Sequence, residues 1–316
     1  MRLRRKGATG ATLIAATVLA MLAAACGSGG GSKVSSNSVA SQMVMGGPPE
    51  CKTRITCLVG LQQIYGLQFK DFKSLDAGGP LTKSALSNGD IQVARLFSSD
   101  EAIQLKGYVI LDDDKHFQLA GNIIPVIRTA KATSEVKSLL NEVSKAMTQD
   151  DLVTINKAID INHTDPSDAA KQFVKNKGLA RTPSSGSKES ITIGSANFAE
   201  NEALADIYGE VLKSAGYSVT LKTGLGAREI IQPALTSGQL DLIPEYVGNY
   251  LNFIDPTVTG GLTLDQTVSK LRTEVASKGL TLLDPSTATD ADSIGVTKAT
   301  ADKYHLKKIS DLGKAA

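Results

Sequence analysis

The feature that most constrains this chain is residues 191–254, where short apolar strands alternate with amphipathic helices. Apolar strands are expected over 191–193, 218–221 and 240–243. The segment between the first two strands has apolar residues at helical spacing, and a second helix is expected over 228–236. This β-α-β-α-β order predicts a parallel sheet with helices on its faces, and therefore an α/β fold.

Three turns of this stretch follow the predicted strands and contain Asn197, Gly226 and Tyr246. In a parallel sheet the carboxyl ends of the strands meet at one edge, where ligands bind. Asn197 and Glu200 also have the spacing of a capping box, which predicts that a helix begins there. The sequence therefore predicts a binding site beside a helix start.

The beginning of the chain is typical of an export signal. Four basic residues precede an apolar run over 11–24 that is too short to span a bilayer as a stable helix. Three alanines lead to Cys26, followed by a Gly/Ser-rich segment over 27–32, an arrangement that resembles a bacterial lipobox with its tether. We expect residues 1–26 to be a lipoprotein signal peptide, lipidated at Cys26, and residues 27–40 to be a flexible tether. The alternative is an ordinary signal peptide with an incidental cysteine.

The exported part of the chain is close to neutral. The whole chain has 34 basic and 32 acidic side chains, and the signal holds four basic and no acidic ones. The remainder therefore has 30 basic and 32 acidic side chains, a formal net charge of −2. Nothing in this balance indicates a nucleic-acid partner. The remaining length of about 290 residues suits two domains.

Two cysteines remain after the signal, Cys51 and Cys57. In an exported protein a close pair of this kind predicts a small-loop disulfide. Two free, buried thiols are the alternative. Because no histidine or third cysteine stands near the pair, a metal site is not expected there.

A second α/β pattern lies outside residues 191–254, and a polar Pro/Gly/Ser linker over 181–190 separates it from that stretch. The expected strands are 44–45, 108–111, 123–127, 280–283 and 294–296, with an extended segment over 69–75; the expected helices are 59–65, 264–278, 299–304 and 310–315, and three more that begin near Ser134, Thr148 and Asp165.

Residues that indicate catalysis or metal binding are scarce. His116, His163 and His305 have neither the spacing of metal ligands nor a nucleophile partner motif. We therefore expect no catalytic site, no metal ion and no cofactor.

Two segments carry a family resemblance: GSANFAEN at 194–201 and GLGAREIIQPALTSGQLDLIPEYVGN at 224–249. They resemble the opening half of the substrate-binding proteins of osmoprotectant ABC importers, of the glycine betaine, carnitine and choline-binding type. The resemblance implies a type II periplasmic-binding-protein fold, in which two α/β lobes face a cleft and close about a hinge. It also implies the disulfide between Cys51 and Cys57.

The order of the two halves is unusual for that family. The half that opens the family's mature proteins is residues 191–316 here, and residues 41–180 resemble the family's second half. We therefore predict a circular permutant whose usual termini are joined through 181–190. The sequence leaves open whether this order is natural or engineered. Lobe I is predicted to contain 121–180 and 191–296, and lobe II 41–120 and 297–316, with the chain crossing between them near 120–123 and 292–296.

Quaternary ammonium ligands are held by aromatic faces, because the cation is attracted to ring quadrupoles. The family uses tyrosines from both lobes; Tyr246 matches one of these positions, and Phe97 stands where another tyrosine usually lies. The two other positions of the family's cage lack an aromatic ring here. Phe198 or Tyr250 could supply the missing faces, or could belong to the core.

Polar residues take the places of the missing rings. Asn201 stands where the family often has Gln, and Asn249 where it often has Thr. Arg54 matches a position that in some members pairs with a ligand carboxylate; a surface arginine beside the disulfide is the alternative. The candidate ligand-binding residues are Arg54, Phe97, Ser98, Gly121, Asn122, Asn197, Phe198, Asn201, Tyr246, Asn249, Tyr250, Asp290, Asp292 and Ser293.

The resemblance implies a monomeric, lipid-anchored solute-binding protein on the extracytoplasmic face of the cell membrane. Such a protein captures a small osmoprotectant-type molecule, a quaternary amine or related compatible solute, and delivers it to an ABC permease with its cytoplasmic ATPase. Four alternatives remain open. They are a hydroxylated or polyphenol-like ligand in the same site, a ligand-sensing lipoprotein without transport, an exported enzyme, and an engineered binding scaffold.

Overall fold

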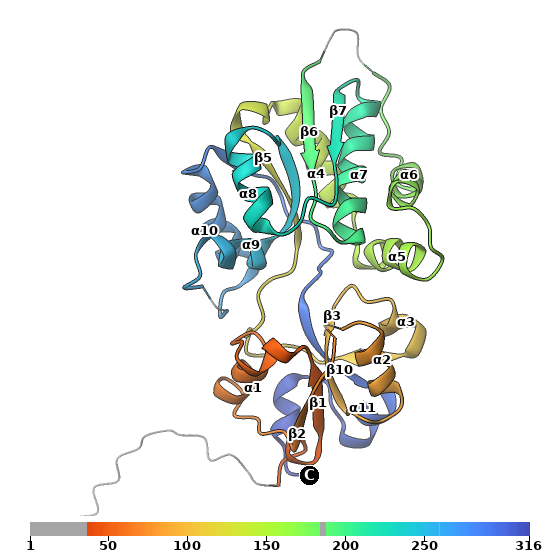
Figure 1. The fold of residues 1–316 in the computed structure, drawn as a ribbon, viewed down its shortest axis with the longest axis vertical. Coiled ribbons are helices and arrows are strands. Elements are labelled where there is room, and N and C mark those ends of the chain that lie inside the picture. Colours follow the sequence, from red (N-terminus) through yellow and green to blue (C-terminus); the bar gives the residue numbers. More distant parts are fainter. Residues whose placement is uncertain (1–36, 77, 184–187, 259) are drawn as a thin grey trace, which may run out of the picture. The chain divides into compact units, whose positions relative to one another are not determined.

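A computed structural model of the chain describes residues 37–76, 78–183, 188–258 and 260–316 (Figure 1). The predicted signal peptide and lipidation site at Cys26 lie outside the described residues. Of the flexible tether predicted over 27–40, Ser38, Val39 and Ala40 are instead buried in lobe II.

Lobe II is built on a five-stranded mixed sheet, in the order β2-β1-β3-β10-β4. The strand β1 is parallel to β2 and β3, whereas β10 is antiparallel to β3 and β4. The elements of this lobe are β1 (Val44–Gly47), α1 (Leu58–Gln63), β2 (Asp71–Ser74), α2 (Pro80–Ser87), β3 (Val93–Phe97), α3 (Ala102–Lys106), β4 (Tyr108–Ile110), β10 (Asp292–Thr297) and α11 (Lys298–Tyr304), with 3-10 helices at Ala40–Gln42, Pro49–Lys52 and Ile309–Gly313.

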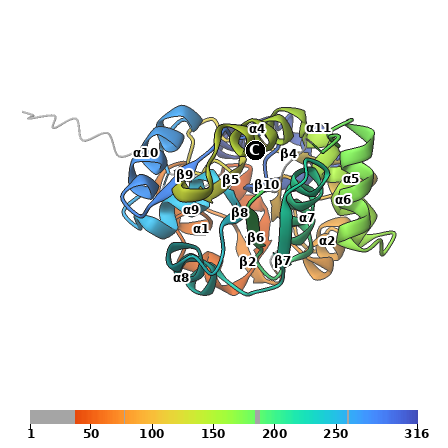
Figure 2. The same ribbon diagram turned by 90° about the horizontal axis from the view of Figure 1, so that it is seen from above.

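Lobe I is built on a second five-stranded sheet, in the order β7-β6-β8-β5-β9. Here β6 is parallel to β7 and β8, and β5 is antiparallel to β8 and β9. Its elements are β5 (Ile123–Arg128), α4 (Ser134–Ala146), α5 (Gln149–Asp160), α6 (Pro166–Asn176), β6 (Ser190–Gly194), α7 (Ala199–Ser214), β7 (Ser218–Lys222), α8 (Arg228–Ser237), β8 (Leu242–Tyr246), α9 (Val247–Ile254), α10 (Leu264–Ala276) and β9 (Leu280–Leu282), with a 3-10 helix at Thr129–Lys131. The helices α6 and α10 lie on opposite sides of this sheet (Figures 1 and 2).

The two sheets share one plan. In each sheet, the first of three parallel strands along the chain lies between the other two: β1 between β2 and β3, and β6 between β7 and β8. One antiparallel strand, β10 or β5, then lies between this group and the edge strand, β4 or β9. This is the topology of the type II periplasmic-binding-protein fold. The predicted α/β class and the parallel arrangement of β6, β7 and β8 are confirmed.

Local sequence signals explain where several helices begin and end. Thr148 forms a capping box with Asp151, and the Asp165 carboxylate accepts a hydrogen bond from the backbone N–H of Ser167, so α5 and α6 begin where predicted. Gly238 ends α8 in the left-handed conformation, with a φ of 83°. The helices α3 and α9 were not predicted.

The capping box predicted from Asn197 and Glu200 is wrong. Phe198 is the N-cap of α7, and no side chain caps this helix start. Glu200 is instead buried and points away from the helix end, toward Asn156 and Tyr246. The helix itself does begin here, at Ala199, but without the predicted capping box.

The lobes are joined by two chain segments that are hydrogen-bonded to one another. Asn122 forms an antiparallel bridge with Thr289, and the Asp290 N–H donates to the carbonyl of Gly121 at 2.9 Å. Since β10 pairs with β3 along Asp292–Gly295, this strand belongs to the sheet of lobe II. The second crossing therefore ends before residue 292, earlier than the boundary at 296 that the sequence suggested.

The two ends of the described chain meet in lobe II. Ser38 and Ala315 form an antiparallel bridge. The Ala316 N–H donates to the carbonyl of Asn37 at 3.0 Å, and the Val39 N–H donates to that of Lys314 at 2.9 Å. Residues 37–39 and 314–316 thus lie side by side in lobe II.

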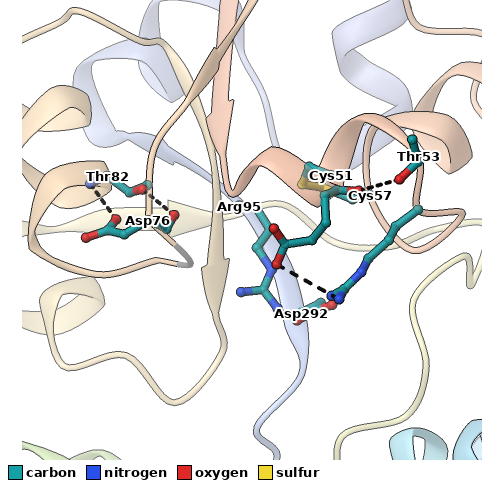
Figure 3. The surroundings of a disulfide bond; sticks show 9 residues. Cys51, Thr53, Cys57, Asp76, Thr82, Arg95 and Asp292 are labelled. Atoms are coloured by element: carbon teal, nitrogen blue, oxygen red, sulfur yellow. Dashed lines mark hydrogen bonds and ion pairs between the residues drawn. A yellow bond between two sulfur atoms is a disulfide. The ribbon is translucent and has the colours of Figure 1, made fainter.

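The structure contains the predicted disulfide between Cys51 and Cys57 (Figure 3). Both cysteines are buried and join the 3-10 helix Pro49–Lys52 to the start of α1. The disulfide packs against Gly47, the last residue of β1, where a Cβ would lie 3.1 Å from the Cys51 sulfur. The bridge therefore fixes the loop that follows β1.

Candidate ligand-binding cavity

A cavity of about 900 Å³ lies where both lobes contribute residues beside the second crossing segment. Lobe II supplies the start of α2, the end of β3 and α3; lobe I supplies the end of α5, the start of α7 and the end of β8. This volume is in the range of small-molecule sites. Five of the candidate residues line it: Phe97, Phe198, Tyr246, Asn249 and Asp290.

Two aromatic rings of lobe I stack in the wall of the cavity. Tyr246, the last residue of β8, is only 3% exposed, whereas Phe198 at the N-cap of α7 is 43% exposed. Their ring centroids lie 6.1 Å apart with an interplanar angle of 29°. The exposed ring of Phe198 therefore offers an apolar surface supported by a rigid, buried partner.

Glu200 is the centre of a buried hydrogen-bond network. The Tyr246 hydroxyl donates to Glu200 Oε1 at 2.7 Å, and Asn156 Nδ2 donates to Glu200 Oε2 at 2.5 Å. Asn156 also donates to the carbonyl of Ser99 at 3.2 Å, and Ser99 Oγ donates to Asp290 Oδ1 at 2.6 Å. This chain of contacts joins α5 and α7 of lobe I to the loop after β3 in lobe II.

The environment of this network favours the neutral carboxyl. Burial, followed by repulsion from Asp290, raises the pKa of Glu200 to about 8. Burial also raises the pKa of Asp290. Burial therefore favours the neutral form of Glu200 at neutral pH.

The rest of the cavity carries further charges. Lys83 Nζ lies 2.9 Å from both Asp100 Oδ1 and Glu101 Oε1. Arg228 at the start of α8 makes a bidentate contact with Glu245, with Nε 2.9 Å from Oε1 and a terminal nitrogen 2.8 Å from Oε2. Both basic groups are thus already paired with carboxylates of the protein.

Phe97 enters the cavity from lobe II with one face occupied. The Arg95 guanidinium carbon lies 4.1 Å from the centroid of its ring. Arg95 also forms an ion pair with Asp292 of β10 (Figure 3). Burial lowers the pKa of Arg95 to about 10. Asp292 therefore serves as the counter-ion of a buried arginine and does not line the cavity.

A smaller cavity of about 320 Å³ in lobe I contains Asn197 and Asn201. Asn201 Oδ1 accepts from the Ala196 N–H at 2.7 Å, and its Nδ2 donates to the carbonyl of Pro244 at 3.3 Å. Asn201 thus joins the turn after β6 to β8. Phe198, Tyr246 and Arg228 line both cavities.

Four other candidates lie in or beside the crossing segments, outside the lining of the larger cavity. Ser98 Oγ donates to the carbonyl of Thr289 at 2.9 Å, and Asn122 Nδ2 donates to that of Ser286 at 2.9 Å. Ser293 Oγ donates to the carbonyl of Ala291 at 3.1 Å. Gly121 approaches the backbone of Asp290 so closely that a Cβ would lie 2.6 Å from it.

Two further candidates lie away from the cavity. Tyr250 is buried in the apolar cluster between α9 and α10, and its hydroxyl donates to Gln232 Oε1 at 2.6 Å. Arg54 is exposed and lies 3.9 Å from Glu50, beside the disulfide. Tyr250 therefore lies in the core and Arg54 on the surface. These are the alternatives to ligand binding that the sequence left open for the two residues.

Several lining residues were not predicted: Lys83, Ser99, Asp100, Glu101, Asn156, Asp160, Glu200 and Arg228. Ser99, Asp100 and Glu101 directly follow β3, so the rule that ligands bind beyond the carboxyl ends of strands applies to them. Asn156 lies in the middle of a helix, where no local signal distinguishes it. Among the described residues no group of three or more His, Cys, Asp or Glu side chains could hold a metal ion.

The family of the chain follows from a comparison with known sequences. Residues 32–176 and 189–316 match the family described as the substrate-binding domain of the ABC-type glycine betaine transport system. The chain belongs to this family of transporter substrate-binding proteins, which is not a class of enzyme.

Curated relatives match over a shorter span. A glycine-betaine-binding protein of Pseudomonas aeruginosa is 31% identical over 131 residues, covering 40% of each chain. The glycine betaine-binding protein YehZ of Escherichia coli is 31% identical over 128 residues, covering 39% of this chain and 41% of the relative. The matches thus span about two-fifths of the length of these relatives.

Solved structures show only a distant similarity. A glycine betaine/carnitine/choline ABC transporter structure has a TM-score of 0.39 at 12% identity, covering 86% of this chain and 90% of that one. The apo form of YehZ has a TM-score of 0.37 at 12% identity, covering 87% and 92%. Within the described ranges, no helix has the length and apolar character needed to cross a membrane.

Proposed function

We propose that this protein is a lipid-anchored, extracytoplasmic binding protein that captures a small osmoprotectant-type solute and delivers it to an ABC permease with its cytoplasmic ATPase. The family of the chain supports the solute-binding role. Names of the curated relatives suggest betaine-like solutes as the first compounds to test.

The observation that carries this proposal is the cavity of about 900 Å³, whose walls come from both lobes beside two hydrogen-bonded crossing segments. A solute in this cavity would contact both lobes at once. Two-lobe proteins of this kind close about their crossings when a ligand links the lobes. We propose that Phe97, Phe198, Tyr246, Asn249 and Asp290 contact the solute.

A thermal-shift screen of the purified protein tests this role. The panel contains glycine betaine, carnitine, choline, primary amines, polyols and polyphenols. A ligand that binds only the folded state raises the melting temperature by mass action. At least one class should raise it, and Phe198→Ala should reduce that shift, because Phe198 is exposed in the cavity and its truncation leaves the core intact. No shift with any class would contradict the solute-binding role.

Lipid anchoring is a separate part of the proposal. Metabolic labelling with an alkyne fatty acid should modify the wild-type protein and leave Cys26→Ser unmodified. Labelling of both, or of neither, would contradict the anchor at Cys26.

We also propose that the chain is a circular permutant of its family. The hydrogen bonds between residues 37–39 and 314–316 support this proposal. In a circular permutant these two segments are the positions where the family's usual chain is cut, so they are expected to lie side by side in the folded protein. At the other junction, Lys131 pairs with Glu189 and Lys188 with Glu135, so residues flanking 184–187 are held against lobe I.

A further inference from the structure

We infer that the large cavity takes a cation with N–H donors, such as a primary amine or guanidinium compound, and discriminates against carboxylate-bearing zwitterions. This inference rests on the solute-binding role proposed for the same cavity. Three observations carry it: the charge of the lining, the state of its aromatic rings, and the pairing of its basic groups.

The lining has more acidic than basic groups. Its five carboxyls belong to Asp100, Glu101, Asp160, Glu200 and Asp290, and its three bases to Lys83, Lys106 and Arg228. The formal excess is two negative charges when all groups are ionised. When Glu200 is protonated, the excess is one negative charge. A cation entering the cavity is therefore attracted at neutral pH.

The aromatic rings offer few open faces. One face of Phe97 is covered by Arg95, and the Tyr246 ring is buried against Phe198. A quaternary ammonium group has no N–H donor and depends on such faces. An N–H-bearing cation can instead donate to the carboxylate of Asp290, which lines the cavity, and charge-assisted hydrogen bonds of this kind are about twice as strong as neutral ones.

The basic groups are poorly placed to hold a ligand carboxylate. Lys83 is paired with Asp100 and Glu101, and Arg228 is paired with Glu245. The third base, Lys106, is exposed at the end of α3. A zwitterion would bring its carboxylate into a cavity with an acidic excess, without an unpaired buried cation to receive it.

Isothermal titration calorimetry with matched ligands tests this inference. The probes are 1,4-diaminobutane, its fully N-methylated counterpart, glycine betaine and a neutral polyphenol. We expect 1,4-diaminobutane to bind at least tenfold more tightly than any of the other three. Asp290→Asn, which removes one charge at constant shape, should weaken its binding at least tenfold.

The control is Asp206→Asn, which removes a buried carboxyl from α7 outside the cavity lining and should leave the affinity unchanged. Equal binding of 1,4-diaminobutane by wild type and Asp290→Asn would overturn the inference. So would tighter binding of glycine betaine, the methylated probe or the polyphenol, although each of these results would still support the solute-binding role. Absence of binding by every probe, together with a negative thermal-shift screen, would overturn both.

Discussion

Among single residues, Glu200 has an environment that should make the stability of the protein depend on pH. Its pKa is raised from an ordinary 4.5 to about 8 by burial and by Asp290. The folded state therefore holds a proton that the unfolded state releases above pH 4.5. The stabilising contribution is fully present below about pH 4.5 and is lost as the pH rises through about 8.

We expect Glu200→Gln to flatten this dependence, because the amide cannot titrate. Urea denaturation of wild type and variant between pH 4.5 and 8.5 measures the effect. Glu210→Gln is the matched control: this partly exposed carboxylate on the same helix pairs with Lys213, and its removal should leave the slope unchanged. An equal decline in wild type and Glu200→Gln would assign the slope to the other carboxyls with raised pKa values: Asp100, Asp160, Asp206 and Asp290.

The Tyr246 hydroxyl gives a second prediction. Tyr246→Phe removes its hydrogen bond to Glu200 and keeps the ring in the apolar core. We expect a loss of about 1 kcal/mol in the free energy of unfolding, the usual value for one buried hydrogen bond. Tyr208→Phe is the control, since Tyr208 is equally buried but its hydroxyl bonds to no residue in the described part of the chain. Equal losses in the two variants would argue that the Tyr246–Glu200 bond contributes nothing.

At the level of elements, Gln149 at the start of α5 connects lobe I to the second crossing and to the loop after β3. Its Nε2 donates to the carbonyls of Ser98 at 3.0 Å and Thr289 at 3.1 Å, and its Oε1 accepts from the Thr289 N–H at 2.8 Å. One side chain thereby ties lobe I to the loop after β3 and to the second crossing.

We expect Gln149→Ala to increase hydrogen–deuterium exchange at the amide of Thr289, because that N–H loses its acceptor. Gln172→Ala on α6 removes a glutamine whose side chain donates to Asn176 and should leave exchange at Thr289 unchanged. If Thr289 exchanged equally in wild type and Gln149→Ala, the glutamine would have no part in holding the crossing.

The disulfide closes a short loop, since its cysteines are six positions apart. Reduction should add the mass of two hydrogens and lower the free energy of unfolding by about 2 kcal/mol, less than for longer loops. Mass spectrometry and urea denaturation measure the two effects. In the double variant Cys51→Ser, Cys57→Ser, the reductant should change neither the mass nor the free energy of unfolding. A wild-type mass unaltered by the reductant would contradict the disulfide.

The elements could be predicted well from the sequence because periodicity and capping are local. Thr148 and Asp165 start their helices by contacts within three residues. The network around Glu200 could not, because Asn156 and Glu200 are 44 positions apart and meet only after α5 and α7 have packed. Tyr246, Phe97 and Asp290 line the cavity and were predicted from the resemblance at strand ends and crossings, whereas Lys83 of α2 and Lys106 of α3 had no such signal.

For the whole molecule, the proposed permutation predicts that the family's usual order also folds. A chain that starts at residue 188, runs to Ala316, continues into Asn37 and ends at residue 183 retains every described element. We expect its melting temperature to lie within a few degrees of wild type and its ligand affinity to be unchanged, because the joined ends are already hydrogen-bonded. A chain that fails to fold would show that the present order is required.

The contact between residues 37–39 and 314–316 in lobe II also determines which lobe a lipid at Cys26 would be attached to. The proposed lipidation site, Cys26, precedes residue 37, which bonds to Ala316 beside the sheet of β1. In the family's usual order the chain would instead begin at β6, in lobe I. If both the proposed lipid anchor and the proposed permutation are correct, the anchor is attached to lobe II in this chain and would be attached to lobe I in the family's usual order.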